Sequence, residues 1–199
     1  MKKLILLELN EINFDVVKKY IASDATLPGF KRLIDEGLIT TTCESSYSLL
    51  EPWIQWPSVH MGLSYEEHKL FRLGDVVNSE IPQIFEEVES LGYSVGAISP
   101  MNAENRLQNA AYFIPDPWTQ TRPDKSFTSR VLSGALSQAI NDNSQSRLTL
   151  RSVISLLFSF IVLVSPRAYP RLVTMALRAR GKSWLKAIFL DSFLFEVHK

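Results

Sequence analysis

Short apolar runs alternate with helix-period segments through the first half of the chain, and this alternation restricts the fold more than any other feature. Residues 4–9 form a nearly continuous apolar run, and residues 38–43 are rich in β-branched side chains. Between them, apolar residues recur at helical spacing over 14–21 and 30–34, and Gly37 is placed to end the second helix. The order strand, helix, strand predicts a parallel sheet flanked by helices, with residues 4–9 as a buried central strand.

The same order recurs downstream, and then the strands stop. A helix is predicted from Ile81-Pro82 to Gly92, followed by a strand over 93–99. Past residue 125 only helical patterns follow, over 127–140, 148–164, 169–180 and 184–197. We therefore predict an α/β core portion over residues 1–124, followed by a helical segment over 125–199 that is an insertion or the start of a missing second half.

Composition and charge exclude several classes of protein. The chain has 199 residues, 46% of them hydrophobic, with 21 basic and 21 acidic side chains, which is the profile of a soluble globular protein. A net charge of zero argues against a general nucleic-acid binder, because neutralising phosphates needs a basic surplus. The single cysteine, Cys43, cannot form an internal disulfide, so we expect a cytoplasmic location.

The helical segment combines an apolar stretch with a one-sided charge. Residues 152–164 carry no charge and stop before Pro166, well short of the roughly 20 residues of a membrane span, which predicts a buried or interfacial helix. Eight basic and no acidic residues lie between Asp142 and Asp191. Two interpretations stay open: helices packed on the rest of the protein with solvated cations, or peripheral contact with an anionic membrane or an acidic partner.

Two places in the first half carry side chains suited to chemistry. Glu8, Asn10 and Glu11 follow the first predicted strand, and ligands gather at the carboxyl ends of parallel strands. Their oxygens suit a divalent metal, or they form a helix-start cluster and a surface charge. Residues 49–68 are dense in Trp, Pro, His and Glu, which predicts an irregular loop; His60 and His68 within it are candidate ligands or packed structural histidines.

Four stretches, taken in order, resemble the alkaline phosphatase superfamily, in particular its type I phosphodiesterase/nucleotide pyrophosphatase, phosphoglycerate mutase and sulfatase-like branches. Residues 4–17 are similar to its first strand and turn. The other three stretches are LPGFKRLIDEG over 27–37, WPSVHMGLSYEEH over 56–68 and IFEEVESLGYSVGAI over 84–98. The resemblance implies the N-terminal portion of an alkaline-phosphatase-like α/β fold. It also implies divalent metal ions, zinc or manganese, and a phosphate- or sulfate-ester substrate.

The resemblance also assigns roles to individual residues. Glu8, Asn10 and Glu11 are the implied metal ligands, with Asn10 at the position of the family's metal-binding Asp. Glu51 is placed near the substrate, and His60 or His68 would orient ligands or substrate oxygens. The family's Ser or Thr nucleophile falls just before Trp56, yet residues 49–57 contain no Ser, Thr or Cys.

These observations leave three hypotheses. The first is the N-terminal part of a longer metal-dependent phosphate- or sulfate-ester hydrolase, with little activity in isolation. The second is a non-catalytic member of the superfamily, a pseudoenzyme that binds a partner or an anionic surface, which the missing nucleophile favours. The third is an unrelated α/β protein whose matches are coincidental.

Overall fold

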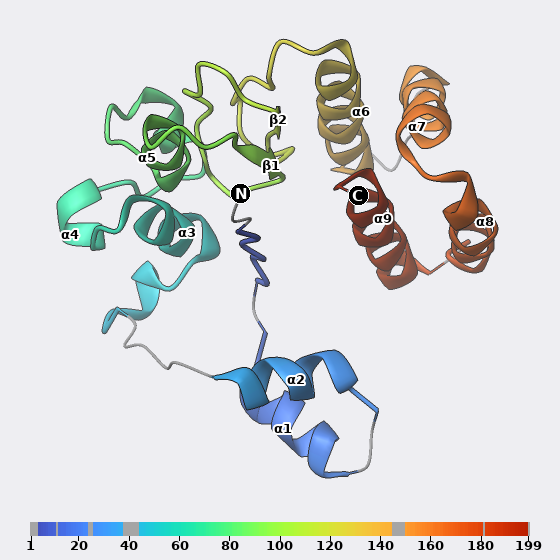
Figure 1. Cartoon of the computed structure of the whole chain (residues 1–199), viewed down its shortest axis with the longest axis horizontal. Coiled ribbons are helices and arrows are strands. Elements are labelled where there is room, and N and C mark those ends of the chain that lie inside the picture. The colour runs from blue at the N-terminus through green and yellow to red at the C-terminus, as the bar shows by residue number, and fades with distance from the viewer. Residues whose placement is uncertain are drawn as a thin grey trace. The chain divides into compact units, whose positions relative to one another are not determined.

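The computed structural model describes residues 4–10, 12–23, 26–37, 44–144, 150–180 and 182–198. The chain divides into two compact units, Met1–Pro52 and Trp53–Lys199. Figure 1 labels the helices and strands of the two units. The domain boundary predicted at residues 124 and 125 falls inside the second unit and stays a prediction.

The first unit contains the two helices that the sequence predicts. They are α1 (Phe14–Ala22) and α2 (Pro28–Glu36), followed by a short 3-10 turn, η1 (Tyr47–Leu49). The side chain of Asn13 starts α1 by accepting hydrogen bonds from the backbone N–H groups of Asp15 and Val16 at 3.0 and 3.1 Å. The rings of Phe14 and Phe30 meet edge to face, 6.5 Å apart, and thereby join the two helices.

The prediction of a buried central strand over residues 4–9 is wrong. These residues form no strand, and their apolar side chains are exposed, with Leu4 83% and Ile5 78% accessible. A strand needs a neighbouring strand to take up its backbone hydrogen bonds, and the described part of this unit offers none. The strand predicted over 38–43 lies outside the described residues, as do Glu11 and Cys43.

The second unit holds a short parallel strand pair with helices on both sides of it in the chain. The strands are β1 (Gly96–Ile98) and β2 (Tyr112–Ile114), with Ala97 opposite Phe113. Before them come α3 (Pro52–Met61), α4 (Tyr65–His68), η2 (Asp75–Asn78) and α5 (Ile84–Ser90). After them come α6 (Phe127–Ser144), α7 (Leu150–Leu163), η3 (Pro166–Ala168), α8 (Tyr169–Arg178) and α9 (Ser183–His198). Mixed α/β structure and a parallel strand pair are therefore confirmed, whereas the resemblance to the alkaline phosphatase fold stays a prediction.

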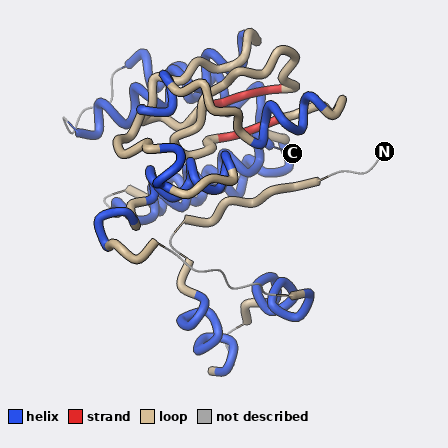
Figure 2. The backbone as a smooth tube through the Cα atoms, turned by 90° about the vertical axis from the view of Figure 1, so that its left-hand side faces the viewer, coloured by secondary structure: helices blue, strands red, loops and turns tan. Residues whose placement is uncertain are grey.

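The alternation of side chains along the strands separates two cores. Ala97 and Phe113 point to one side, where they pack with Phe85 of α5. Ile114 points to the other side, into a larger core built by α6 to α9 around Leu132 and Leu172. Figure 1 shows the strand pair between α5 and α6, and Figure 2 shows the two strands in red. We call residues 53–124 the hub region and residues 127–198 the helical region.

Gly96 is required where β1 meets β2. It lies opposite Tyr112 in the strand register, and the tyrosine ring covers its Cα. A Cβ at this position would come within 2.3 Å of the ring, far inside van der Waals contact. Only glycine therefore allows this packing without a shift of the tyrosine.

The prediction of an irregular loop over residues 49–68 is wrong, because most of this segment forms α3 and α4. Pro57 lies inside α3 and cannot donate to the carbonyl of Trp53, four residues earlier. That carbonyl instead accepts a 2.7 Å hydrogen bond from Nδ2 of Asn102. A side chain distant in sequence thus satisfies the backbone group that the proline leaves, so Pro57 does not end the helix.

The helical patterns in the second half of the sequence are confirmed. The predicted ranges correspond to α6, α7, α8 and α9, and their ends differ by a few residues. The predicted helix after Ile81-Pro82 is α5, which ends before Gly92 in the left-handed region, φ 81°. The strand predicted over 93–99 is confirmed for its last part, β1.

Candidate functional site

The predicted metal ligands belong to an irregular segment of the first unit. Glu8 is half-buried and Asn10 is exposed, whereas Glu11 lies outside the described residues. One carboxylate and one amide are fewer ligands than a zinc centre needs. No three His, Cys, Asp or Glu side chains of the described ranges come together as a metal site. The described residues therefore supply at most part of the implied metal site, which stays a prediction, and we derive no reaction step through it.

The three predicted catalytic residues are distributed over both units. Glu51 is exposed at the end of the first unit, whereas His60 and His68 belong to the second unit and are 1% and 4% accessible. The ring of His60 lies 6.0 Å from Trp56 and 5.2 Å from Phe85. These aromatic contacts account for the position of His60 as a packed histidine of the hub region.

Ser58 and His68, both within the described residues, are arranged like a nucleophile and its base. Ser58 Oγ lies 2.8 Å from His68 Nε2. The backbone N–H of Leu70, however, donates to His68 Nδ1 over 3.0 Å. Because Nδ1 accepts, the proton of the neutral ring is on Nε2, which donates to Ser58 Oγ. Activating the serine needs the opposite tautomer, so this contact ties α4 to α3 instead.

Two buried side chains hold the loops that follow β1 and β2. Asn102, after β1, donates to Trp53 O and accepts from the backbone N–H of Gly74 at 2.9 Å. Its own N–H donates to Asp116 Oδ2, after β2, at 2.9 Å. Asp116 also accepts from the N–H groups of Trp118 and Thr119 and from the Thr119 hydroxyl.

We call Asn102 and Asp116 the polar hub. It lies at the carboxyl ends of two parallel strands, where ligands bind in many α/β proteins. Here the buried groups bond to one another, and Asn102 keeps a left-handed backbone, φ 49°. The sequence analysis missed both residues. The turn-forming sequence Pro-Asp-Pro at 115–117 is the feature that could have predicted the loop after β2, which contains Asp116.

A second group that sequence reasoning missed is a pair of partly buried carboxylates. Burial raises the pKa of Glu86, against a backbone hydrogen bond from Gln83 and the charge of Arg106, which lower it. Burial also raises the pKa of Glu104, and the charge of Glu86 adds to that shift. Oε1 of Glu86 and Oε2 of Glu104 are buried without a hydrogen-bond partner in the described part of the chain.

The most unusual surface of the described chain is on α7. Among the α7 side chains that the structure describes, the exposed ones recur at helical spacing and are apolar: Leu150, Val153, Ile154, Leu157, Phe158, Ile161 and Val162. On the side that packs against the protein, Ser159 is 1% accessible, and its hydroxyl has no hydrogen-bond partner in the described part of the chain. Helix α7 is therefore apolar on both sides, because Phe160 and Leu163 pack into the core of the helical region while other apolar residues of the helix are exposed. We call the seven residues the outer face of α7.

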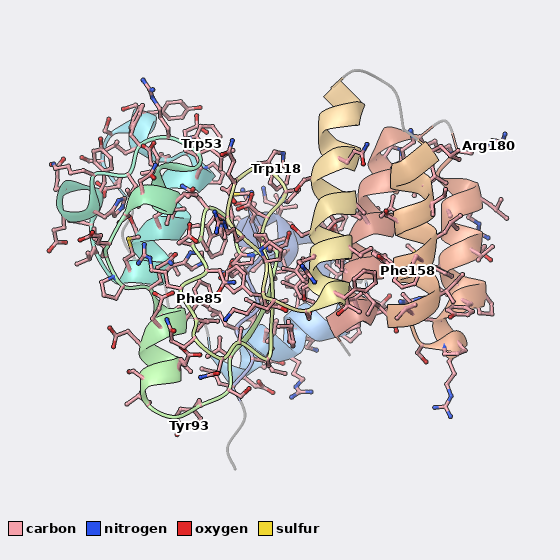
Figure 3. The ribbon with its side chains drawn as sticks, turned by 90° about the horizontal axis from the view of Figure 1, so that it is seen from above. Trp53, Phe85, Tyr93, Trp118, Phe158 and Arg180 are labelled. Atoms are coloured by element: carbon pink, nitrogen blue, oxygen red, sulfur yellow. The ribbon has the colours of Figure 1, made fainter. Side chains whose placement is uncertain are left out.

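The exposed cations of the helical region lie mainly where α8 ends and α9 begins. Arg178, Arg180, Lys182 and Lys186 are exposed there, and Arg180 extends outward from the helices in Figure 3. Within the described ranges none of these four pairs with a carboxylate, whereas Arg171 pairs with the buried Glu196 at 2.9 Å.

No single helix of the described ranges combines the length and apolar character of a membrane span. Val153–Leu163 and Pro166–Arg178 are long and apolar enough for a membrane span only when taken together, and a bend of 116° separates them. An apolar helix that cannot cross a bilayer alone can still lie in its interface.

None of the three comparisons, with protein-family models, with curated proteins and with solved structures, finds a match to this chain.

Proposed function

We propose that the helical region binds peripherally to an anionic lipid surface through the outer face of α7. The observation that supports this proposal is the composition of that face, whose seven exposed side chains among the described residues of α7 are apolar. Soluble monomers seldom expose a continuous apolar patch of this kind, and such patches mark interaction sites. A helix of this type lies in the plane of the interface, with its apolar side chains among the acyl chains.

The positive charge of the helical region favours an anionic partner, and an anionic bilayer also suits the apolar outer face of α7. Residues 143–190 contain eight basic and no acidic side chains, so this part of the chain is strongly positive. A second copy of the chain would bring the same positive charge against itself and be repelled. An anionic bilayer attracts it, at about 1 kcal/mol per cation near the surface. The cytoplasmic leaflet carries such charge, in keeping with the predicted cytoplasmic location, which stays a prediction.

Vesicle co-sedimentation of the full chain tests the proposal. We expect binding to vesicles of phosphatidylcholine with added phosphatidylserine and weak binding to phosphatidylcholine alone. Binding should fall when the salt concentration is raised to about 1 M, where the Debye length is about 3 Å. Leu157→Gln/Ile161→Gln should abolish it, because both side chains belong to the outer face of α7.

The matched control is Leu91→Gln/Tyr93→Gln, which removes two exposed apolar side chains from the hub region. This control should bind as the unchanged chain does. No sedimentation with anionic vesicles would overturn the proposal, and so would binding that survives the double substitution in α7.

Metal-dependent ester hydrolysis is kept as a second proposal. What supports it is the order of α5 and β1 within residues 84–98, the stretch that resembles the superfamily's helix and strand. Elemental analysis of the purified chain, together with hydrolysis of a p-nitrophenyl phosphodiester, tests it. Bound metal with turnover would support it, and Asn10→Asp should then strengthen metal binding. A metal-free, inert chain would count against activity in this chain.

A further inference from the structure

The corner between α8 and α9 combines charge, exposure and an aromatic anchor. Four exposed cations, Arg178, Arg180, Lys182 and Lys186, lie close in sequence to Trp184, which is 61% accessible. We call these five residues the basic corner. Tryptophan beside basic residues is the composition found at the level of lipid headgroups, because the indole ring is amphipathic.

The backbone of the corner is ordered by its own hydrogen bonds. The N–H of Lys182 donates to Ala179 O at 3.0 Å, and the N–H of Lys186 donates to Lys182 O at 3.3 Å. Arg178 ends α8, Lys186 lies near the start of α9, and Arg180 and Lys182 lie between the two helices. The four cations therefore belong to one short stretch of the chain, so a single ligand can meet more than one of them.

The charges of the corner are available for a ligand. In the described chain these four side chains form no ion pair with a carboxylate, and the sequence from 143 to 190 contains no acidic residue. Two of the four are arginines, whose planar guanidinium groups bind phosphate through two parallel hydrogen bonds. The chemistry of the corner therefore suits phosphate oxygens.

We propose that the basic corner selects lipids whose headgroups carry phosphomonoesters, such as a bisphosphorylated phosphoinositide, over lipids with a single negative charge. This inference rests on the proposed membrane binding. A phosphomonoester carries about −1.5 to −2 charges at pH 7, so one such headgroup can meet several cations of the corner at once. Clusters of four to eight Lys or Arg on amphipathic helices bind phosphatidylserine and phosphoinositides, so the preference proposed here rests on the higher charge of the phosphomonoester headgroup.

The test compares two sets of vesicles with equal total lipid charge. One contains phosphatidylserine and the other a bisphosphorylated phosphoinositide, both in phosphatidylcholine. We expect tighter binding to the phosphoinositide vesicles, on the order of tenfold. Arg180→Gln/Lys182→Gln/Lys186→Gln should remove this preference while keeping binding through α7. The control Lys18→Gln/Lys19→Gln/Lys31→Gln removes the same charge from exposed positions of the first unit and should keep the preference.

Two further measurements make the outcome decisive. Tryptophan emission should shift to shorter wavelength with phosphoinositide vesicles, and Trp184→Phe should reduce that shift. Salt titration of the unchanged chain gives the number of charges involved without any variant. The inference is overturned if Arg180→Gln/Lys182→Gln/Lys186→Gln still binds phosphoinositide vesicles more tightly than phosphatidylserine vesicles.

Other results separate the two proposals. Equal binding to both vesicle sets overturns the lipid preference and leaves membrane binding standing. Binding of soluble inositol trisphosphate as tight as vesicle binding overturns the assignment to a lipid. Absence of binding to any vesicle overturns the proposed function and this inference with it.

Discussion

The polar hub and the outer face of α7 differ in where their polar and apolar groups lie. In the hub region Asn102 and Asp116 are buried and bonded to partners, so these polar groups inside the protein stabilise it. In the helical region the seven described residues of the outer face of α7 are apolar and exposed. The comparison indicates that the polar hub is satisfied within the protein, whereas the outer face of α7 is the surface available for the proposed membrane contact.

The largest expected effect is on the polar hub. Asn102→Ala leaves the carbonyl of Trp53 and the N–H of Gly74 without their partner. We expect a loss of about 3 kcal/mol of unfolding free energy, measured by urea denaturation, because each orphaned buried group costs about 1 to 3 kcal/mol. Asn109→Ala, in an exposed loop, is the control and should change little.

A double-mutant cycle with Pro57→Ala sharpens this prediction. Alanine restores the N–H that can donate to Trp53 O within α3. Asn102→Ala should therefore cost about 1 kcal/mol less in that background. If Asn102→Ala lowers the unfolding free energy equally with and without Pro57→Ala, Asn102 does not replace the missing backbone hydrogen bond.

A somewhat smaller effect is expected at the strand pair. Gly96→Ala forces the new methyl group against the ring of Tyr112, and overpacking of this kind costs about 1 to 3 kcal/mol. Thermal unfolding measures the loss. Tyr112→Ala in the same chain should recover part of it by removing the clash; a Gly96→Ala chain as stable as the unchanged protein would contradict the packing described here.

The buried carboxylates predict a pH dependence in the hub region. The pKa of Glu86 is raised in the folded state by burial, so the folded chain holds this proton more tightly than the unfolded chain. The protonated Glu86 therefore contributes its full stabilisation at pH values below 4.5, the pKa of the unfolded chain. This contribution is lost as the pH rises through the higher pKa of the folded chain. Glu86→Gln should flatten this slope and stabilise the chain at pH 7, by less than about 1 kcal/mol since the group is partly solvated.

Melting temperatures over a pH series check this prediction. Glu87→Gln, exposed on the same helix, is the control and should keep the slope. If the melting temperature of Glu86→Gln depends on pH as that of the unchanged protein does, another group causes the pH dependence.

The smallest effect on stability is expected on α7, and it separates the two regions most clearly. Leu157→Gln/Ile161→Gln changes only exposed side chains, so the unfolding free energy should stay within about 0.5 kcal/mol of the unchanged protein. The hub substitutions should do the reverse, lowering stability and leaving vesicle binding per folded molecule unchanged. A large loss of stability from the α7 pair would mean that its outer face packs within the protein.

The sequence predicted helices better than strands, for a physical reason. In α6 and α8 the hydrogen bonds close within a few residues, so the local pattern carries most of the information. The run at 4–9 has the composition of a strand, but a strand depends on a partner elsewhere in the chain. β2 was not predicted because its three residues are too few to show a periodic pattern and because its partner strand lies elsewhere in the chain.

The candidate site was harder to predict than the fold. His60 and His68 were selected by residue type, and the structure places each among buried contacts that residue type does not reveal. The apolar and basic character of the second half was predicted correctly, because composition is a property of the sequence. Which apolar residues of α7 stay outside was not predictable, since that depends on how α6 and α9 pack against it.

The sequence by itself therefore determined α1, α2, α5 and α6 to α9, the cationic second half and the absence of a cysteine framework, all of which depend on neighbouring residues or on composition. Only the tertiary structure decided that α3 continues through Pro57, that Nδ1 of His68 accepts a hydrogen bond, and that α7 turns its apolar face outward. Each of these depends on groups far apart in the chain. Asn102 reaches Trp53 across 49 positions, and no local pattern encodes a contact of that length.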